Sequence, residues 1–136
     1  MSEGLAERGM RVRREVLGEA HVDRAEARKT AVDAEFQDLL TRYAWGEIWN
    51  RPGLDRRTRS CITVAMLTAL GHQEELALHL RGALNNGVTR DEIVEVLLQA
   101  AVYCGIPAAN SAFRVAGEIL GSSEAPARSG SPDARE

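Results

Sequence analysis

The chain has 136 residues, 44% of them hydrophobic but only 4% aromatic, and a formal net charge of −3. This length fits one domain, and a core of Leu, Val, Ile and Ala is more typical of packed helices than of a β-sandwich. A weakly acidic chain lacks the basic surface of a general nucleic-acid-binding protein, and no apolar run is long enough to span a membrane. The totals therefore predict an all-α domain with neither nucleic acid nor membrane as partner.

The two cysteines, Cys61 and Cys104, lie far apart in the sequence. A disulfide framework needs more cysteines, and a redox pair is usually closer together. The simplest interpretation is two buried thiols in a reducing compartment. Because the N-terminus also lacks the apolar segment of a signal peptide, we expect a cytoplasmic protein.

Hydrophobic periodicity predicts about six helices. Asp55 is a good N-cap for the third helix, and Thr89 with Glu92 forms a capping box for the fifth. Residues 21–31 are polar and have little to bury, so they are expected to form a connector with one or two loose helical turns. The helices are expected over residues 3–20, 32–49, 55–71, 73–86, 89–105 and 106–120.

The middle of the third helix, CITVAMLTAL, is apolar on nearly every side. Such a helix lies either at the centre of a bundle or at a contact between subunits, and the sequence leaves both open. Residues 122–136 lack large apolar side chains and are predicted to form a disordered tail. We therefore expect a helical extension over residues 1–29, a domain over residues 30–121, and the tail.

The end of the second helix carries the first candidate site. Trp45 and Trp49 flank Glu47, and Arg51 lies four residues beyond that carboxyl group. A solvated ion pair is the simpler reading of Glu47 and Arg51. A carboxyl group partly desolvated by two indoles would instead be suited to proton transfer near neutral pH. Arg57 is a further candidate, because an inward-pointing arginine could bind a carboxylate in bidentate fashion.

His72, Glu75 and His79 follow one face of the fourth helix. The two histidines are two turns apart, about 10 Å by helical rise, which is too far to share one metal ion easily. Zinc sites also need tightly convergent ligands, so no metal site is predicted. Leu76, Leu80 and Ala83 surround His79, which makes a structural histidine the simpler interpretation and a catalytic one the sharper hypothesis.

The order of the motifs carries a family resemblance. WGEIWNRPGLDRRTRS is followed by ELALHLRGALNNGVTRDEI and then by GIPAANSAFR. Over about residues 30–120 the chain closely resembles the carboxymuconolactone decarboxylase family of the alkyl-hydroperoxidase D-like superfamily. Peroxidases of that superfamily carry Cys-x2-Cys-x3-His, where this chain has His72, Glu75 and His79. Both thiols are missing, which favours the decarboxylase branch.

The resemblance implies an all-α, alkyl-hydroperoxidase D-like bundle that assembles as a homo-oligomer, usually a ring-shaped hexamer. It also implies decarboxylation of 4-carboxymuconolactone, a dicarboxylate lactone, to 3-oxoadipate enol-lactone in protocatechuate degradation by the β-ketoadipate pathway. The family uses no cofactor. His79 is expected to donate a proton or a hydrogen bond, and Glu47 to tune or reprotonate His79. Arg51, with Arg57 as the second choice, is expected to bind a substrate carboxylate, and Trp45 and Trp49 are expected to form apolar walls.

Three alternatives remain open from the sequence. The first is a thiol-dependent peroxidase of the same superfamily. The second is a helical assembly module without enzymatic activity, and the third is a related enzyme acting on a different unsaturated lactone acid. The pocket could also be shared between subunits.

Overall fold

The computed structural model describes residues 3–121, which form α-helices and one π-helix with no strand among them. The prediction of an all-α fold is confirmed. The predicted tail over residues 122–136 lies outside the described residues. None of the described helices is long and apolar enough to cross a bilayer. In chain order the helices are α1 (Leu5–Leu17), α2 (Glu19–Ala27), α3 (Ala34–Leu40), η1 (Thr41–Ile48), α4 (Arg56–Leu70), α5 (Gln73–Asn85), α6 (Arg90–Cys104) and α7 (Ile106–Leu120).

The predicted starts of the third and fifth helices, at Asp55 and Thr89, are confirmed. The Asp55 carboxylate accepts a hydrogen bond of 2.8 Å from the Thr58 backbone N–H at the start of α4. Thr89 and Glu92 form the reciprocal capping box at the start of α6. These side chains satisfy backbone donors that a helix leaves unpaired in its first turn.

The connector over residues 21–31, predicted with one or two loose helical turns, contains most of the regular nine-residue helix α2. Val22 is fully buried and supplies the one buried side chain of this helix. Arg14 of α1 donates hydrogen bonds of 2.7 Å to Glu19 and 2.8 Å to Asp23. One apolar anchor and these ion pairs stabilise a helix whose own periodicity is too weak to predict it.

The helix predicted over residues 32–49 is present but changes type at Thr41. The backbone N–H of Trp49 donates to the carbonyl of Ala44, five residues earlier, in the wider turn of the π-helix η1. Such segments occur often at functional sites. Here the turn places the rings of Trp45 and Trp49 in a stack with centroids 5.0 Å apart.

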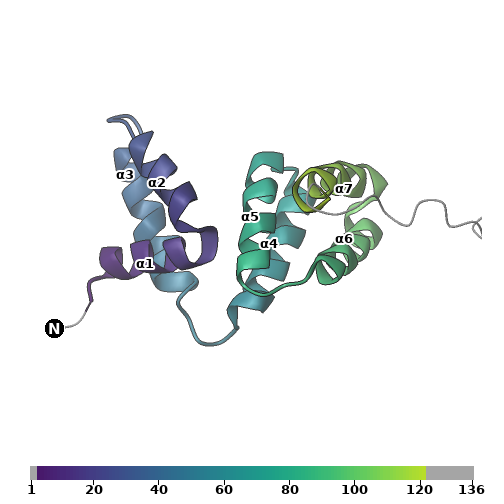
Figure 1. Ribbon diagram of the computed structural model, residues 1–136, viewed down its shortest axis with the longest axis horizontal. Helices are drawn as coiled ribbons and strands as arrows, with labels where there is room; N and C mark the ends of the chain where they lie inside the picture. The colour runs from purple at the N-terminus through teal and green to yellow at the C-terminus, as the bar shows by residue number, and fades with distance from the viewer. Residues whose placement is uncertain (1–2, 122–136) are drawn as a thin grey trace, which may run out of the picture.

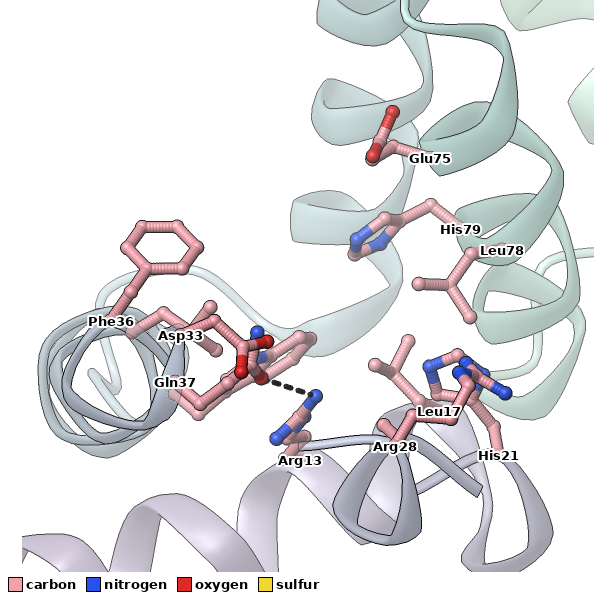
Figure 2. Close-up of a pocket in the computed structure, with 13 residues that line it drawn as sticks. Arg13, Leu17, His21, Arg28, Asp33, Phe36, Gln37, Glu75, Leu78 and His79 are labelled. Carbon is pink, nitrogen blue, oxygen red and sulfur yellow. Dashed lines mark hydrogen bonds between the residues drawn. The ribbon is translucent and has the colours of Figure 1, made fainter. Parts of the chain in front are cut away.

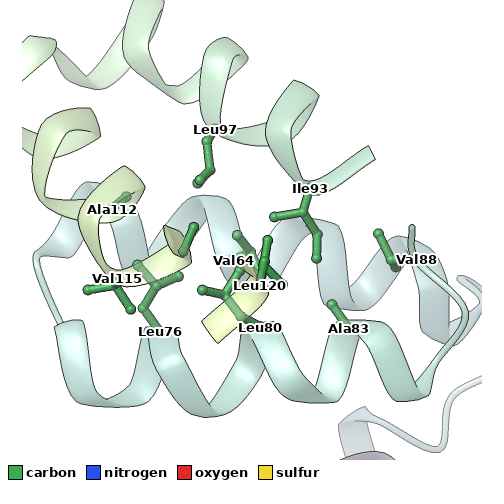
Figure 3. Close-up of a cluster of buried hydrophobic side chains, with 11 residues drawn as sticks. Val64, Leu76, Leu80, Ala83, Val88, Ile93, Leu97, Ala112, Val115 and Leu120 are labelled. Carbon is green, nitrogen blue, oxygen red and sulfur yellow. The ribbon is translucent and has the colours of Figure 1, made fainter. Parts of the chain in front are cut away.

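The helices form two groups (Figure 1), with α5 facing the N-terminal one. Figure 3 shows the core of the C-terminal group, where aliphatic side chains of α4, α5, α6 and α7 meet. Its most deeply buried large members are Leu76, Leu80, Ile93 and Leu97. The N-terminal group has its own core, formed by Val12, Val16, Leu17, Val22 and Trp45.

Helix α1 joins the two groups because its backbone lies very close to both neighbours. A Cβ at Gly9 would collide with the carbonyl oxygen of Thr41, and one at Gly46 would lie 2.7 Å from the carbonyl oxygen of Leu5. On the other side, the Asn85 amide of α5 donates a hydrogen bond of 3.0 Å to the Val16 carbonyl. These contacts fix where α1 lies relative to η1 and α5.

Gly9→Ala should destabilise the fold by about 2 kcal/mol, because rigid backbone must move to admit the methyl group. Chemical denaturation measures this directly. Gly117→Ala in α7 is the matched control, since nothing lies within 4 Å of a Cβ there. That variant should be unchanged or more stable by about 0.5–1 kcal/mol. Equal stability of the Gly9→Ala variant and the wild type would contradict the tight contact.

Candidate active site

A cavity of 480 Å³ lies between the two groups of helices (Figure 2), with α1, α2 and α3 on one side and α5 on the other. Polar and charged side chains reach it from every one of these helices. Apolar side chains from α1, α3, η1 and α5 form the remaining wall. The lining residues are Arg13, Leu17, His21, Ala25, Arg28, Asp33, Phe36, Gln37, Leu40, Trp45, Glu75, Leu78 and His79.

The imidazole of His79 lies against both indoles of η1. Its centroid is 6.1 Å from that of Trp45 with the planes 6° apart, and 6.2 Å from that of Trp49 at 21°. The four-residue spacing puts both tryptophans on one side of η1, so they form a shared apolar backing for the ring. The geometry holds the imidazole in one orientation at the wall of the cavity.

Burial lowers the pKa of His79 from its ordinary value of 6.5 to about 4. The nearby Glu75 carboxylate acts in the opposite direction and His21 reinforces the lowering, but desolvation of the charged ring dominates. The imidazole is therefore neutral at pH 7 in the ligand-free protein. A neutral ring can donate a hydrogen bond from one nitrogen and accept a proton at the other.

Arg13 is the most deeply buried cation of the cavity, with only 5% of the residue exposed. Its Nη2–H donates a long hydrogen bond of 3.4 Å to the side-chain oxygen of Gln37, and its Nη1 lies 3.8 Å from a Glu26 carboxylate oxygen. Its Nε and Nη1 are buried without a hydrogen-bond partner. Unpaired buried donors are costly, so this guanidinium retains unused capacity to bind an anion.

Further positive charge lies around His21. Burial lowers the pKa of this histidine, and Arg13, Arg24, Arg28 and Arg81 lower it further through repulsion. Of these, Arg28 also lines the cavity. The Asp33 carboxylate, which lies opposite in the lining, accepts hydrogen bonds from the Thr30 backbone N–H and hydroxyl.

Comparison with known proteins decides what kind of site this is. The sequence profile of the Carboxymuconolactone decarboxylase family matches residues 34–118. The chain belongs to the carboxymuconolactone decarboxylase family. The fold and the cavity are therefore those of a family member, and the resemblance of its motifs to this family is confirmed.

Two relatives aligned over most of their length are named as decarboxylases. The chain is 49% identical to the 4-carboxymuconolactone decarboxylase of Acinetobacter baylyi over 112 residues, 82% of this chain and 84% of that protein. It is 46% identical to the nitrosuccinic acid decarboxylase of Metarhizium robertsii over 111 residues, 82% of this chain and 78% of that protein. Both alignments are longer than the stretch from residue 34 to the end of this chain, so both include part of the segment before the family profile.

A third relative matches over a shorter stretch. The chain is 51% identical over 39 residues to a 4-carboxymuconolactone decarboxylase of Pseudomonas putida, 29% of this chain and 81% of that sequence.

The structure brings three of the predicted site residues of this family member together. His79 and Trp45 line the cavity, and Trp49 stacks on both. Glu47 is exposed and does not line the cavity. Two positions along a helix turn a side chain to its far side, so the indoles at 45 and 49 do not desolvate the carboxyl group at 47.

The two predicted arginines lie elsewhere within the chain. Arg51 is exposed, and its backbone carbonyl accepts a hydrogen bond of 3.2 Å from Arg59. Arg57 forms an ion pair of 2.6 Å with Glu92, which links α4 to the start of α6. Neither lines the cavity. The guanidinium groups that line it are those of Arg13 and Arg28.

Arg13 is not among the predicted site residues, although its position in the sequence carries a signal of burial. In α1 the buried positions are Gly9, Val12, Arg13, Val16 and Leu17, so the arginine lies on the apolar stripe. A charged residue at such a position is rarely buried unless it has a partner or a functional role. His21 and Arg28 carried no comparable signal, because they lie in the stretch predicted to be a connector.

The remaining candidates do not converge on this cavity. Among residues 3–121, no cluster of His, Cys, Asp and Glu side chains could hold a metal ion. Cys61 and Cys104 are both free thiols. His72 is exposed and makes no side-chain cap at the start of α5.

Acidification should destabilise the native state through His79. Its native pKa of about 4 lies below the ordinary 6.5, so the unfolded chain binds more protons as the pH falls between those values. The free energy of unfolding should therefore decrease from about pH 6.5 towards pH 4, by up to about 3 kcal/mol from this group.

Denaturant titrations at several pH values measure this loss. His79→Gln should remove the His79 contribution, whereas His72→Gln, at an exposed position, should keep the wild-type profile. Comparing the variants isolates one group, because the carboxylates contribute equally to all profiles. Identical pH profiles for wild type and His79→Gln would contradict the buried neutral imidazole.

Proposed function

We propose that this protein decarboxylates 4-carboxymuconolactone to 3-oxoadipate enol-lactone, a step of protocatechuate degradation by the β-ketoadipate pathway. The observation that carries the proposal is the 49% identity to the Acinetobacter baylyi enzyme over most of both chains. The cavity supports it independently, because it combines buried positive charge with a neutral imidazole.

The chemistry of the substrate explains which groups the protein must provide. The departing carboxylate is attached to the γ-carbon of an α,β-unsaturated lactone. As the bond to CO₂ breaks, its electron pair forms a new double bond between the γ- and β-carbons, and the original π pair moves toward the lactone carbonyl. The product forms when the α-carbon of this dienolate gains one proton. The protein must hold two carboxylates, stabilise the dienolate oxygen and deliver that proton.

His79 is suited to the proton transfer because its charge state responds to a bound anion. The ring is neutral in the ligand-free protein, and a dianion in the cavity raises the pKa of His79. The imidazole then takes up a proton from solvent as the substrate binds, stabilises the growing negative charge and gives the proton to the α-carbon. The two indoles keep its ring in place during this transfer.

Glu47, Arg51 and Arg57 receive no role in this step within one chain. Their distance from the cavity leaves a role only across a contact between subunits, which is a separate proposal. The thiol-dependent alternative has no support in the described residues, because Cys61 and Cys104 lie on different helices and are unpaired.

Nitrosuccinic acid is the second candidate substrate, favoured by the 46% identity to the Metarhizium robertsii enzyme. It too is a diacid, and a nitro group on the carbon that loses CO₂ can accept the released electron pair. The same cavity chemistry therefore serves both reactions. Assaying CO₂ release from both acids under identical conditions decides between them.

We also propose that the protein assembles with copies of itself, as a hexamer, in the cytoplasm. The support is an apolar face over α4 and α6, which pack side by side. Several large apolar side chains of these helices are exposed, as is typical of a surface that another protein covers. They are Met66, Leu70, Val102 and Tyr103, with Ile106 at the start of α7.

His79→Gln should lower the rate of decarboxylation by about two orders of magnitude or more, because the variant retains a hydrogen-bond donor but transfers no proton. A spectrophotometric assay with freshly generated 4-carboxymuconolactone measures the rate. His72→Gln is the control and should retain wild-type activity. Near wild-type turnover by the His79→Gln variant would remove the imidazole from the mechanism.

Val102→Glu should dissociate the assembly, because it places a charge among the exposed apolar side chains of α6. Size-exclusion chromatography with light scattering gives the mass in solution. Val32→Glu is the matched control, since Val32 is 95% exposed in the turn before α3 and away from α4 and α6. A monomeric wild type, or an unchanged mass for Val102→Glu, would contradict this interface.

A further inference from the structure

The buried guanidinium of Arg13 has unpaired hydrogen-bond donors that the proton transfer at His79 does not use. Two of its nitrogens have no hydrogen-bond partner although the residue is only 5% exposed. Its ion pair with Glu26 is long at 3.8 Å, and that carboxylate also accepts a hydrogen bond of 3.0 Å from Lys29. Internal partners therefore leave the fork of Arg13 largely unused.

The surroundings of Arg13 favour an anion with a planar, two-oxygen head. The guanidinium lines the cavity, and Arg28 adds a second positive charge to the lining. Two carboxylates, Asp33 and Glu75, also line the cavity, but Asp33 already accepts hydrogen bonds from Thr30. A substrate carboxylate can accept two parallel N–H bonds from the Nε and Nη2 side of an arginine fork. Such a contact satisfies the orphaned Nε–H and replaces the long bond of 3.4 Å from Nη2 to Gln37.

We propose that Arg13, assisted by Arg28, binds the carboxylate that the substrate retains, and that this contact makes the site selective for dicarboxylates. The proposal rests on the proposed decarboxylase function and adds the group that recognises the second carboxylate. Arg13 is here a binding residue, distinct from the imidazole that handles the proton.

The direction of the reaction indicates which carboxylate Arg13 holds. The departing carboxylate becomes neutral CO₂, so a guanidinium bound to it would stabilise the ground state more than the transition state. The retained carboxylate keeps its charge throughout. Figure 2 shows Arg13 reaching the cavity from α1 and His79 reaching it from α5. The departing group then lies against the apolar wall of Trp45 and Leu78, and the α-carbon that gains the proton lies toward His79.

The position of Arg13 in the chain agrees with a role in selectivity. Arg13, His21 and Arg28 all precede residue 34, where the match to the family profile begins. The segment that carries these side chains therefore lies outside the part of the chain that the family profile matches. Both decarboxylase relatives named after diacid substrates align with part of this segment.

A binding experiment tests the proposal without catalysis. Thermal unfolding is followed with adipate and with its monomethyl ester, which has the same chain but one charge. Adipate should stabilise the wild type, with an apparent affinity roughly 10–100-fold above that of the monoester. Arg13→Gln should lose this preference, and Arg13→Lys, which keeps the charge but not the fork, should keep part of it.

Arg11→Gln is the matched control, because Arg11 lies on the exposed side of the same helix and pairs with Glu3. It should keep the full preference for adipate. Equal stabilisation of the wild type by adipate and the monoester would overturn the proposal, and so would an unchanged preference in Arg13→Gln. An arginine with only a structural role would lower the unfolding temperature when replaced and leave the preference intact.

Kinetics separate this proposal from the proposed function. For Arg13→Gln, KM for 4-carboxymuconolactone should rise roughly 10–100-fold with a much smaller change in kcat. The same substitution should hardly change the rate of decarboxylation of a substrate in which the retained carboxylate is esterified. A wild type that releases no CO₂ but still prefers adipate would refute the decarboxylase function alone. A wild type that decarboxylates the diacid and its ester equally well would refute the role of Arg13 alone.

Discussion

The close approach of α1 to η1 is the constraint on which the rest of the structure depends. Without side chains at Gly9 and Gly46, the two backbones meet almost directly, and the Asn85 amide fixes the other side of α1 to α5. This packing brings Arg13 of α1 and Trp45 of η1 to the same cavity as His79 of α5. The site therefore forms only when segments from both groups of helices are in place.

Burial affects the charges of His79 and Arg13 in different ways. It removes the charge of His79 by lowering its pKa, whereas Arg13 keeps its charge and instead lacks hydrogen-bond partners. Both conditions are unfavourable in the ligand-free protein, and both are relieved by an anion. If a dicarboxylate binds as proposed, it raises the pKa of the imidazole and supplies acceptors to the guanidinium, so binding and preparation for proton transfer are coupled.

The helices that could be predicted are those with strong local signals. The cap at Asp55 and the box at Thr89 determine the starts of α4 and α6, and the stripe of leucines determines α5. For α2 the sequence predicts only one or two loose turns, since the ion pairs with α1 that stabilise the full helix are not revealed by a local pattern. His79 was found because its neighbours mark a buried face. Glu47 lies outside the cavity of this chain although it is near two indoles in the sequence, because nearness in sequence does not put side chains on the same side of a helix.

The cavity is divided between two stretches of the chain, and this division has a consequence for substitutions. His79 lies within the part that the family profile matches, whereas Arg13, His21 and Arg28 lie on the preceding segment. Because α1 carries both Arg13 and the close backbone contact with η1, a substitution in this helix can alter the charge of the cavity and the packing of Trp45 on His79 together.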